Sequence, residues 1–178
     1  MLTPEIIAEL RRLDGSRRIA LSNGSFAIVD DNDYDLVAKC FWSVTSGGYV
    51  SGSIKTNIGR RQIRIHRLIT GAPPHMDVDH INGDKLDNRR SNLRVCTTSQ
   101  NSANQGVRSN NTSGYKGVYR SDEGYWRAQI TVRRVKLNLG TYRTKTEAAR
   151  AYDAACLKHF GEYARPNFAP TTSKDGGK

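Results

Sequence analysis

The sequence predicts an α+β protein made of two small domains joined by a polar linker. In the N-terminal half, short apolar stretches alternate with turn dipeptides such as Asn23-Gly24, which is typical of β-strands. Residues 102–114 are rich in Asn, Ser and Gly and too polar to be buried. The remaining chain follows a strand, strand, strand, helix pattern. These observations place domains at 1–105 and 114–168, a linker at 106–113 and a flexible tail at 169–178.

The first 75 residues are predicted to begin with a helix over Pro4–Leu13. Strands are expected to follow at 18–21, 25–29, 49–54 and 62–68. We expect Phe41 and Trp42 to pack against these strands as ordinary core aromatics.

Residues 76–104 combine a strand (77–81), a long polar loop, a second strand (93–97) and a helix that starts near Thr98 or Ser99. An antiparallel pair followed by a helix can bring its two strand ends and the first helical turn to one point. The residues expected to meet there are Asp79, His80, Asn92 and Asn101.

The C-terminal domain is predicted to have three strands at 115–120, 125–133 and 135–140 and a helix over Lys145–Phe160. Thr144 and Glu147 form a capping box at the start of that helix, and Gly161 stands where a C-terminal cap belongs. In the second strand apolar and polar residues alternate, so one sheet face is apolar and the other polar and cationic. A sheet of this kind fits a DNA major groove.

The charge of the chain supports a nucleic-acid partner. Its 178 residues include 28 Lys plus Arg and 17 Asp plus Glu, a net charge of +11. Residues 1–38 are net acidic, whereas 39–110 and 111–178 are each net basic. Clustered cations bind phosphates with release of counterions. We therefore expect two DNA-facing surfaces.

Other classes of protein are disfavoured. The chain has no apolar stretch for a membrane span and no export signal, since charged and apolar residues alternate over Met1–Leu13. Cys40, Cys96 and Cys156 are too far apart for a disulfide framework or a structural zinc site, so a cytoplasmic location is expected. No stacking signature for single-stranded RNA is present.

Asp79, His80, Asn92 and Asn101 can supply the parts of phosphodiester hydrolysis. His80, with an ordinary pKa of about 6.5, is partly neutral at pH 7 and can accept the proton of a water. The side-chain oxygen of Asn92 can orient that imidazole. Asp79 and Asn101 are oxygen donors, which favours Mg²⁺ or Mn²⁺ over Zn²⁺.

A calcium loop is the alternative for this segment. It is disfavoured because the glycine of Asn82-Gly83 comes one position late, and Asn88 stands where a bidentate Glu is required.

The spacing of Asp79-His80, Asn92 and Asn101 resembles the HNH nuclease motif, in the variant of phage and intron-encoded homing endonucleases that has asparagine for the last histidine. The resemblance extends over about residues 17–105. It implies a ββα-metal fold, with Asp79 and Asn101 as metal ligands, His80 as general base and Asn92 as its orienting residue. The missing third histidine argues against zinc chemistry.

Residues 112–168 resemble the ethylene-response-factor type of DNA-binding domain known from plants. The resemblance and the cationic face together give the candidate DNA-binding residues Lys116, Tyr119, Arg127, Gln129, Thr131, Arg133, Lys136 and Asn138. The chain departs from the plant pattern at Tyr119, Glu123 and Asn138, so the plant target sequence is not transferred.

We conclude from the sequence that the chain is a metal-dependent DNA endonuclease of the homing type, from a phage or mobile element, that acts on a specific duplex site. We expect a monomer in the bacterial host cytoplasm, with no small-molecule cofactor. The alternative is a catalytically inactive DNA-binding transcriptional regulator.

Overall fold

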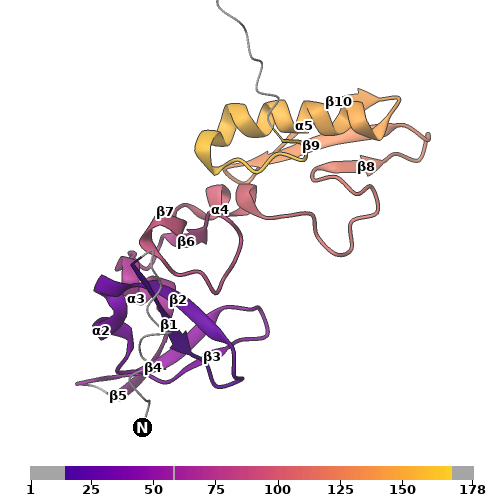
Figure 1. Cartoon of the computed structure of the whole chain (residues 1–178). Helices are drawn as coiled ribbons and strands as arrows, with labels where there is room; N and C mark the ends of the chain where they lie inside the picture. Colours follow the sequence, from indigo (N-terminus) through magenta and orange to yellow (C-terminus); the bar gives the residue numbers. More distant parts are fainter. Residues whose placement is uncertain (1–14, 58, 170–178) are drawn as a thin grey trace, which may run out of the picture. The chain divides into compact units, whose positions relative to one another are not determined.

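The structure is a computed structural model that describes residues 15–57 and 59–169. The helix expected over Pro4–Leu13 and the tail beyond residue 169 lie outside the described residues. The chain divides after Thr97 into two compact units (Figure 1). Each unit combines small antiparallel sheets or hairpins with short helices, which confirms the α+β class.

The first unit begins with the antiparallel pair β1 (Ser16–Ala20) and β2 (Phe26–Asp30). A 3-10 turn (Asp31–Asp33) and the short helix α2 (Tyr34–Val37) follow. A three-stranded antiparallel sheet then forms in the order β3 (Trp42–Val44), β4 (Val50–Thr56) and β5 (Gly59–Arg64).

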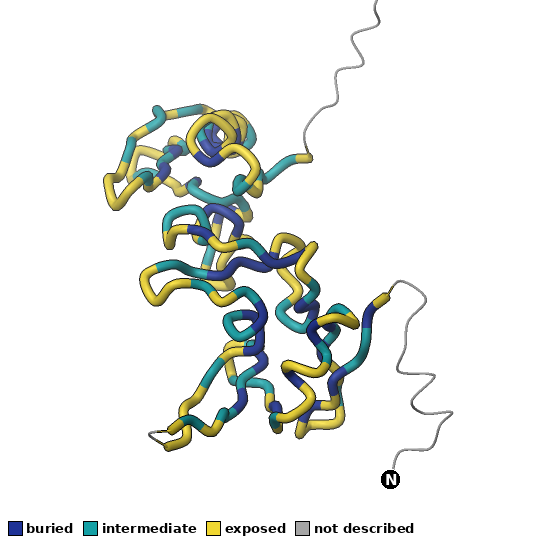
Figure 2. The backbone as a smooth tube through the Cα atoms, turned by 90° about the vertical axis from the view of Figure 1, so that its left-hand side faces the viewer, coloured by how far each residue is buried: buried dark blue, intermediate teal, exposed yellow. Residues whose placement is uncertain are grey.

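Buried apolar side chains from these elements belong to one core. Figure 2 shows the buried residues in dark blue along the backbone. Trp42 is 3% exposed, and its indole N–H donates to the carbonyl of Val37 at 2.9 Å, so its predicted core position is confirmed. The prediction was wrong for Phe41, which is 98% exposed. β3 starts at Trp42, and neighbouring residues of an extended chain point to opposite sides. Gly52, opposite Trp42, lacks a Cβ that would stand 2.7 Å from the indole ring.

The strand predicted over 62–68 is only half correct. β5 ends at Arg64, and helix α3 spans Ile65–Thr70. Ile65, His66 and Ile69 are buried, whereas Arg67 and Leu68 are only half-buried, which is the spacing of one helix face and not the strict alternation of a strand. Gly71, with φ of 61°, ends the helix in the left-handed region.

The predicted hairpin is confirmed as β6 (Asp77–His80) paired with β7 (Leu93–Cys96). Its connecting loop, which includes a 3-10 turn over Arg90–Asn92, is attached to β2 by two backbone hydrogen bonds. Ile28 donates to Leu86 at 2.8 Å, and Asn88 donates to Ile28 at 2.7 Å. The loop is therefore fixed against the N-terminal strands.

The second unit contains a sheet in the order β10 (Val135–Tyr142), β9 (Trp126–Val132) and β8 (Val118–Arg120), with helix α5 (Lys145–Phe160) on it. The capping box of α5 is present, and a 3-10 turn (Gly161–Tyr163) follows the helix. Gly117 (φ 69°) must be glycine, because a Cβ there would stand 2.0 Å from the Tyr152 ring.

Helix α4 (Thr98–Asn104) also belongs to the second unit. Ala103 is buried in a core cluster with Ile130 and Tyr152, and its carbonyl accepts the backbone N–H of Arg165 at 3.3 Å. The division of the chain thus falls before α4, whereas the sequence placed the linker at 106–113. In the part of the chain that the structure describes, no helix is long and apolar enough to cross a membrane.

Candidate active site

His80 lies at the end of β6 and is only 4% exposed. Its Nε2 is 3.2 Å from Oδ1 of Asn88. The amide nitrogen of Asn88 donates to the carbonyls of Lys85 and Leu86 at 3.2 and 3.1 Å, so its oxygen is the atom that faces the imidazole. Because that oxygen can only accept, Nε2 carries the proton and Nδ1 keeps its lone pair. The arrangement prepares His80 Nδ1 to act as a base.

The sequence assigned the orienting role to Asn92, but the structure gives the contact with His80 to Asn88. Asn92 instead shapes the loop: its oxygen accepts from the backbone of Asn82 at 3.0 Å, and its nitrogen donates to Asp87 O at 2.7 Å. The fully buried Asn88 was considered in the sequence only as a calcium-loop position. No local spacing signals a pairing eight residues apart, because the loop must first close.

Burial lowers the pKa of His80, and its bond to Asn88 and the carboxylates of Asp79, Asp84 and Asp87 oppose this shift. A base must be unprotonated at the working pH. The lowered pKa keeps the imidazole neutral at pH 7, and the nearby carboxylates would stabilise the cation that forms once it accepts a proton.

Asp79 is buried and lies directly opposite Arg94 of β7. Arg94 donates to Asp79 Oδ2 from Nε at 2.9 Å and from Nη2 at 2.7 Å. Among the residues that the structure describes, no three His, Cys, Asp or Glu side chains gather as a metal cluster. A single carboxylate fits a hydrated Mg²⁺, which takes few protein ligands and keeps several waters, and does not fit a zinc site with three or four protein ligands.

Asn101, the predicted second metal ligand, lies on α4 and is half-buried. It belongs to the second unit, so its role rests on the motif spacing and stays a prediction.

His66 lies on α3 and is not among the site residues predicted from the sequence. It is 3% exposed and packs edge-on against His80, with 5.1 Å between ring centroids and an interplanar angle of 88°. Its Nδ1 is buried without a hydrogen-bond partner. Burial above all, and then His80, Arg64 and Arg67, lower its pKa to about 3. His66 is therefore a neutral ring that supports His80.

This buried ring makes the stability of the first unit depend on pH. Unfolded His66 takes up a proton below pH about 6.5, while folded His66 resists protonation down to about 3. The contribution of neutral His66 to the free energy of unfolding is thus fully present above pH 6.5. It is lost as the pH falls toward 3, by up to about 1.4 kcal/mol per pH unit. The free energy of unfolding can be measured in urea from Trp42 fluorescence, in a Trp126→Phe background. Below pH 6.5 it should fall less steeply with pH for His66→Phe than for the chain that keeps His66. Parallel profiles between pH 6.5 and 4 would contradict this.

In the second unit, strand register aligns the predicted DNA-binding residues into rows. Arg127 is paired with Tyr119 on one side and with Thr141 on the other, with a bulge after Asn138. The next two rows are Gln129 with Asn138, and Thr131 with Lys136. Paired residues share a sheet face, so six of the eight predicted residues lie on one face.

The two remaining residues are placed differently. Arg133 lies in the turn between β9 and β10, where it and Arg134 have φ of 49° and 69° and are exposed. The ammonium of Lys116 donates to the carbonyls of Ala103 and Arg165 at 2.6 and 2.7 Å, and burial lowers its pKa. In this structure Lys116 therefore connects α4 to the C-terminal segment.

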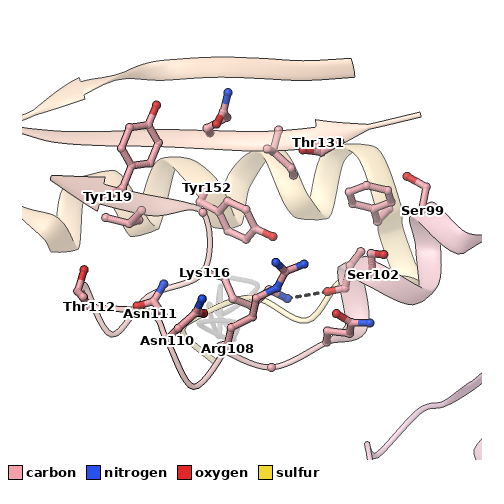
Figure 3. A pocket seen from close by; sticks show the side chains of 18 residues that line it. Ser99, Ser102, Arg108, Asn110, Asn111, Thr112, Lys116, Tyr119, Thr131 and Tyr152 are labelled. Atoms are coloured by element: carbon pink, nitrogen blue, oxygen red, sulfur yellow. Dashed lines mark hydrogen bonds between the residues drawn. The ribbon is translucent and has the colours of Figure 1, made fainter. Parts of the chain in front are cut away.

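A hollow of about 460 Å³ lies beside β8 in the second unit (Figure 3). Tyr152 and Phe160 line it from α5, and Arg108 and Asn110 line it from the segment after α4. Nothing in its lining repeats the chemistry found around His80.

Comparison with known proteins identifies the family of the chain. A family model described as HNH endonuclease matches residues 61–103, which include Asp79, His80, Asn92 and Asn101. An uncharacterised HNH endonuclease of Acanthamoeba polyphaga mimivirus is 32% identical over 148 residues, which cover 81% of this chain and 75% of that protein. This chain belongs to the HNH endonuclease family. It is therefore a nuclease, with DNA as its partner.

This HNH endonuclease is also similar, over shorter stretches, to plant proteins with AP2/ERF-related names. An ethylene-responsive transcription factor of Medicago truncatula is 37% identical over 93 residues, 51% of this chain and 34% of that protein. An AP2/ERF and B3 domain-containing protein of Oryza sativa is 46% identical over 57 residues, 32% of this chain and 16% of that protein. The similarity supports a DNA-binding domain in the part of the chain outside the HNH match.

Proposed function

We propose that this HNH endonuclease is metal-dependent and hydrolyses phosphodiester bonds at a specific site in duplex DNA, as a homing-type enzyme of a phage or another mobile element. The observation that carries the proposal is the buried His80–Asn88 pair next to Asp79, because it provides an oriented neutral base beside a carboxylate. The viral relative and the plant-like DNA-binding domain support the mobile-element and site-specific parts.

In this mechanism a water attacks the phosphorus while His80 Nδ1 accepts its proton. Nε2–H stays bonded to Asn88, so the ring does not turn during the transfer. Asp79 would hold the ion, Mg²⁺ or Mn²⁺, with Asn101 as the second ligand that the motif implies. When bound, such an ion neutralises charge on the phosphate and the leaving oxygen.

We assign target binding to the domain at 114–168 and chemistry to the motif at 76–104. The proposed DNA-facing residues are Tyr119, Arg127, Gln129, Thr131, Arg133, Lys136 and Asn138. Lys116 could join them only if its ammonium left the two carbonyls that it now contacts.

Metal dependence is tested by incubating the full chain with supercoiled plasmid or phage DNA and Mg²⁺, Mn²⁺ or EDTA. We expect nicks with either metal and none with EDTA, and sequencing of the ends should give one preferred site. Asp79→Asn should reduce nicking, with recovery at higher metal concentration if Asp79 is a ligand. If the chain binds DNA but nicks it under no metal condition, the alternative of a catalytically inactive DNA-binding transcriptional regulator is favoured.

A further inference from the structure

Tyr49, just before β4, is the centre of a cluster next to His80. Its ring centroid is 6.2 Å from that of His80 and 5.5 Å from that of His66. Two cations lie over the same ring: Arg64 Cζ at 4.4 Å and Lys85 Nζ at 4.3 Å from its centroid. One side chain thus gathers two positive charges close to the proposed base.

Neither cation is neutralised by a carboxylate among the described residues. The ion pairs of the first unit use Arg17, Arg89, Arg90 and Arg94. Arg64 is exposed, and its guanidinium has five N–H donors. Lys85 uses one of its three on the carbonyl of Gly47 at 2.6 Å. Both side chains therefore keep donors for a ligand.

The charge balance around His80 shows why these cations matter. Of the three carboxylates that act on His80, Asp79 is paired with Arg94 and Asp87 with Arg89, which leaves Asp84. Residues 36–76, which include Arg64, contain no Asp or Glu. Arg64 and Lys85 thus outweigh the one remaining acid, and the site has a surplus of positive charge.

We propose that Arg64 and Lys85 form a phosphate-binding site beside His80 and hold the scissile phosphodiester there. The inference rests on the proposed function. A phosphodiester has two non-bridging oxygens and gains negative charge as the water attacks, so two cations held over one ring beside the base suit the transition state better than the ground state.

Tyr49 is a positioning residue in this site. Both cations lie over its ring, and the negative face of an aromatic ring attracts a positive charge. The ring also contacts both histidines, so it fixes the cations relative to the base.

The test compares single-turnover nicking by the full chain at saturating protein for Arg64→Gln, Lys85→Gln and Arg64→Lys. Arg61→Gln is the matched control, since Arg61 is an exposed cation of the same strand outside the cluster. We expect about 10²-fold slower nicking for each glutamine variant, a smaller loss for Arg64→Lys, and little change for Arg61→Gln. Equal rates for Arg64→Gln, Lys85→Gln and Arg61→Gln would overturn the proposal.

A binding readout separates this proposal from the proposed function. Affinity for duplex DNA is measured in EDTA at several salt concentrations for the wild type, Arg64→Gln and Lys85→Gln. The slope of log affinity against log salt concentration should be weaker by about 0.9 for each phosphate contact that a variant loses. If the wild-type chain never nicks, the proposed function fails. The salt dependence of binding still shows whether Arg64 and Lys85 contact phosphates. Unchanged slopes for Arg64→Gln and Lys85→Gln would then refute the phosphate site as well.

Discussion

Replacing His80 by alanine is expected to lower the single-turnover rate of metal-dependent nicking by about 10²- to 10⁴-fold, the usual contribution of a general base. The physical reason is the tautomer: Asn88 fixes the proton on Nε2, so Nδ1 is the atom that accepts a proton from water. The rate is measured on plasmid DNA at saturating protein and metal.

His75→Ala is the matched control, because His75 is exposed and no predicted role depends on it. It should nick at the wild-type rate. The affinity of His80→Ala for duplex DNA in EDTA should also match the wild type, which separates chemistry from binding. A His80→Ala protein that folds and nicks within threefold of the wild type would remove His80 from the mechanism.

Replacing Asn88 by alanine should slow nicking by about 10- to 100-fold, the usual effect of losing a residue that orients a functional histidine. The substitution removes the bond to His80 Nε2 and the two bonds to Lys85 O and Leu86 O, which hold the loop. In metal-free protein, ¹⁵N spectra of the imidazole should show the Nε2–H tautomer for the wild type and a mixture for Asn88→Ala.

Asn92→Ala is the comparison that assigns the role. Asn92 bonds to the loop backbone, so its loss should reduce stability and activity while His80 keeps the Nε2–H tautomer. If instead Asn92→Ala changes the tautomer and Asn88→Ala does not, then Asn92 orients His80, as the sequence alone suggested.

Much of the fold follows from local patterns. The order of strand, long polar loop and strand predicts the hairpin of β6 and β7, and the Thr144 capping box predicts the start of α5; the structure has both. The row of Gln129 and Asn138 follows from alternation on paired strands. These features depend on residues close in sequence or on a fixed strand period, so they can be predicted without the tertiary structure.

The residue spacing alone is enough to identify an HNH motif and to predict a sheet with one cationic face. The contact between Asn88 and His80, the exposure of Phe41 and the bonds of Lys116 to two carbonyls become visible only once the chain is folded. Folding also brings Tyr49, Arg64 and Lys85 together. Such contacts join residues whose separation along the chain carries no periodic signal, because loop closure and burial create them.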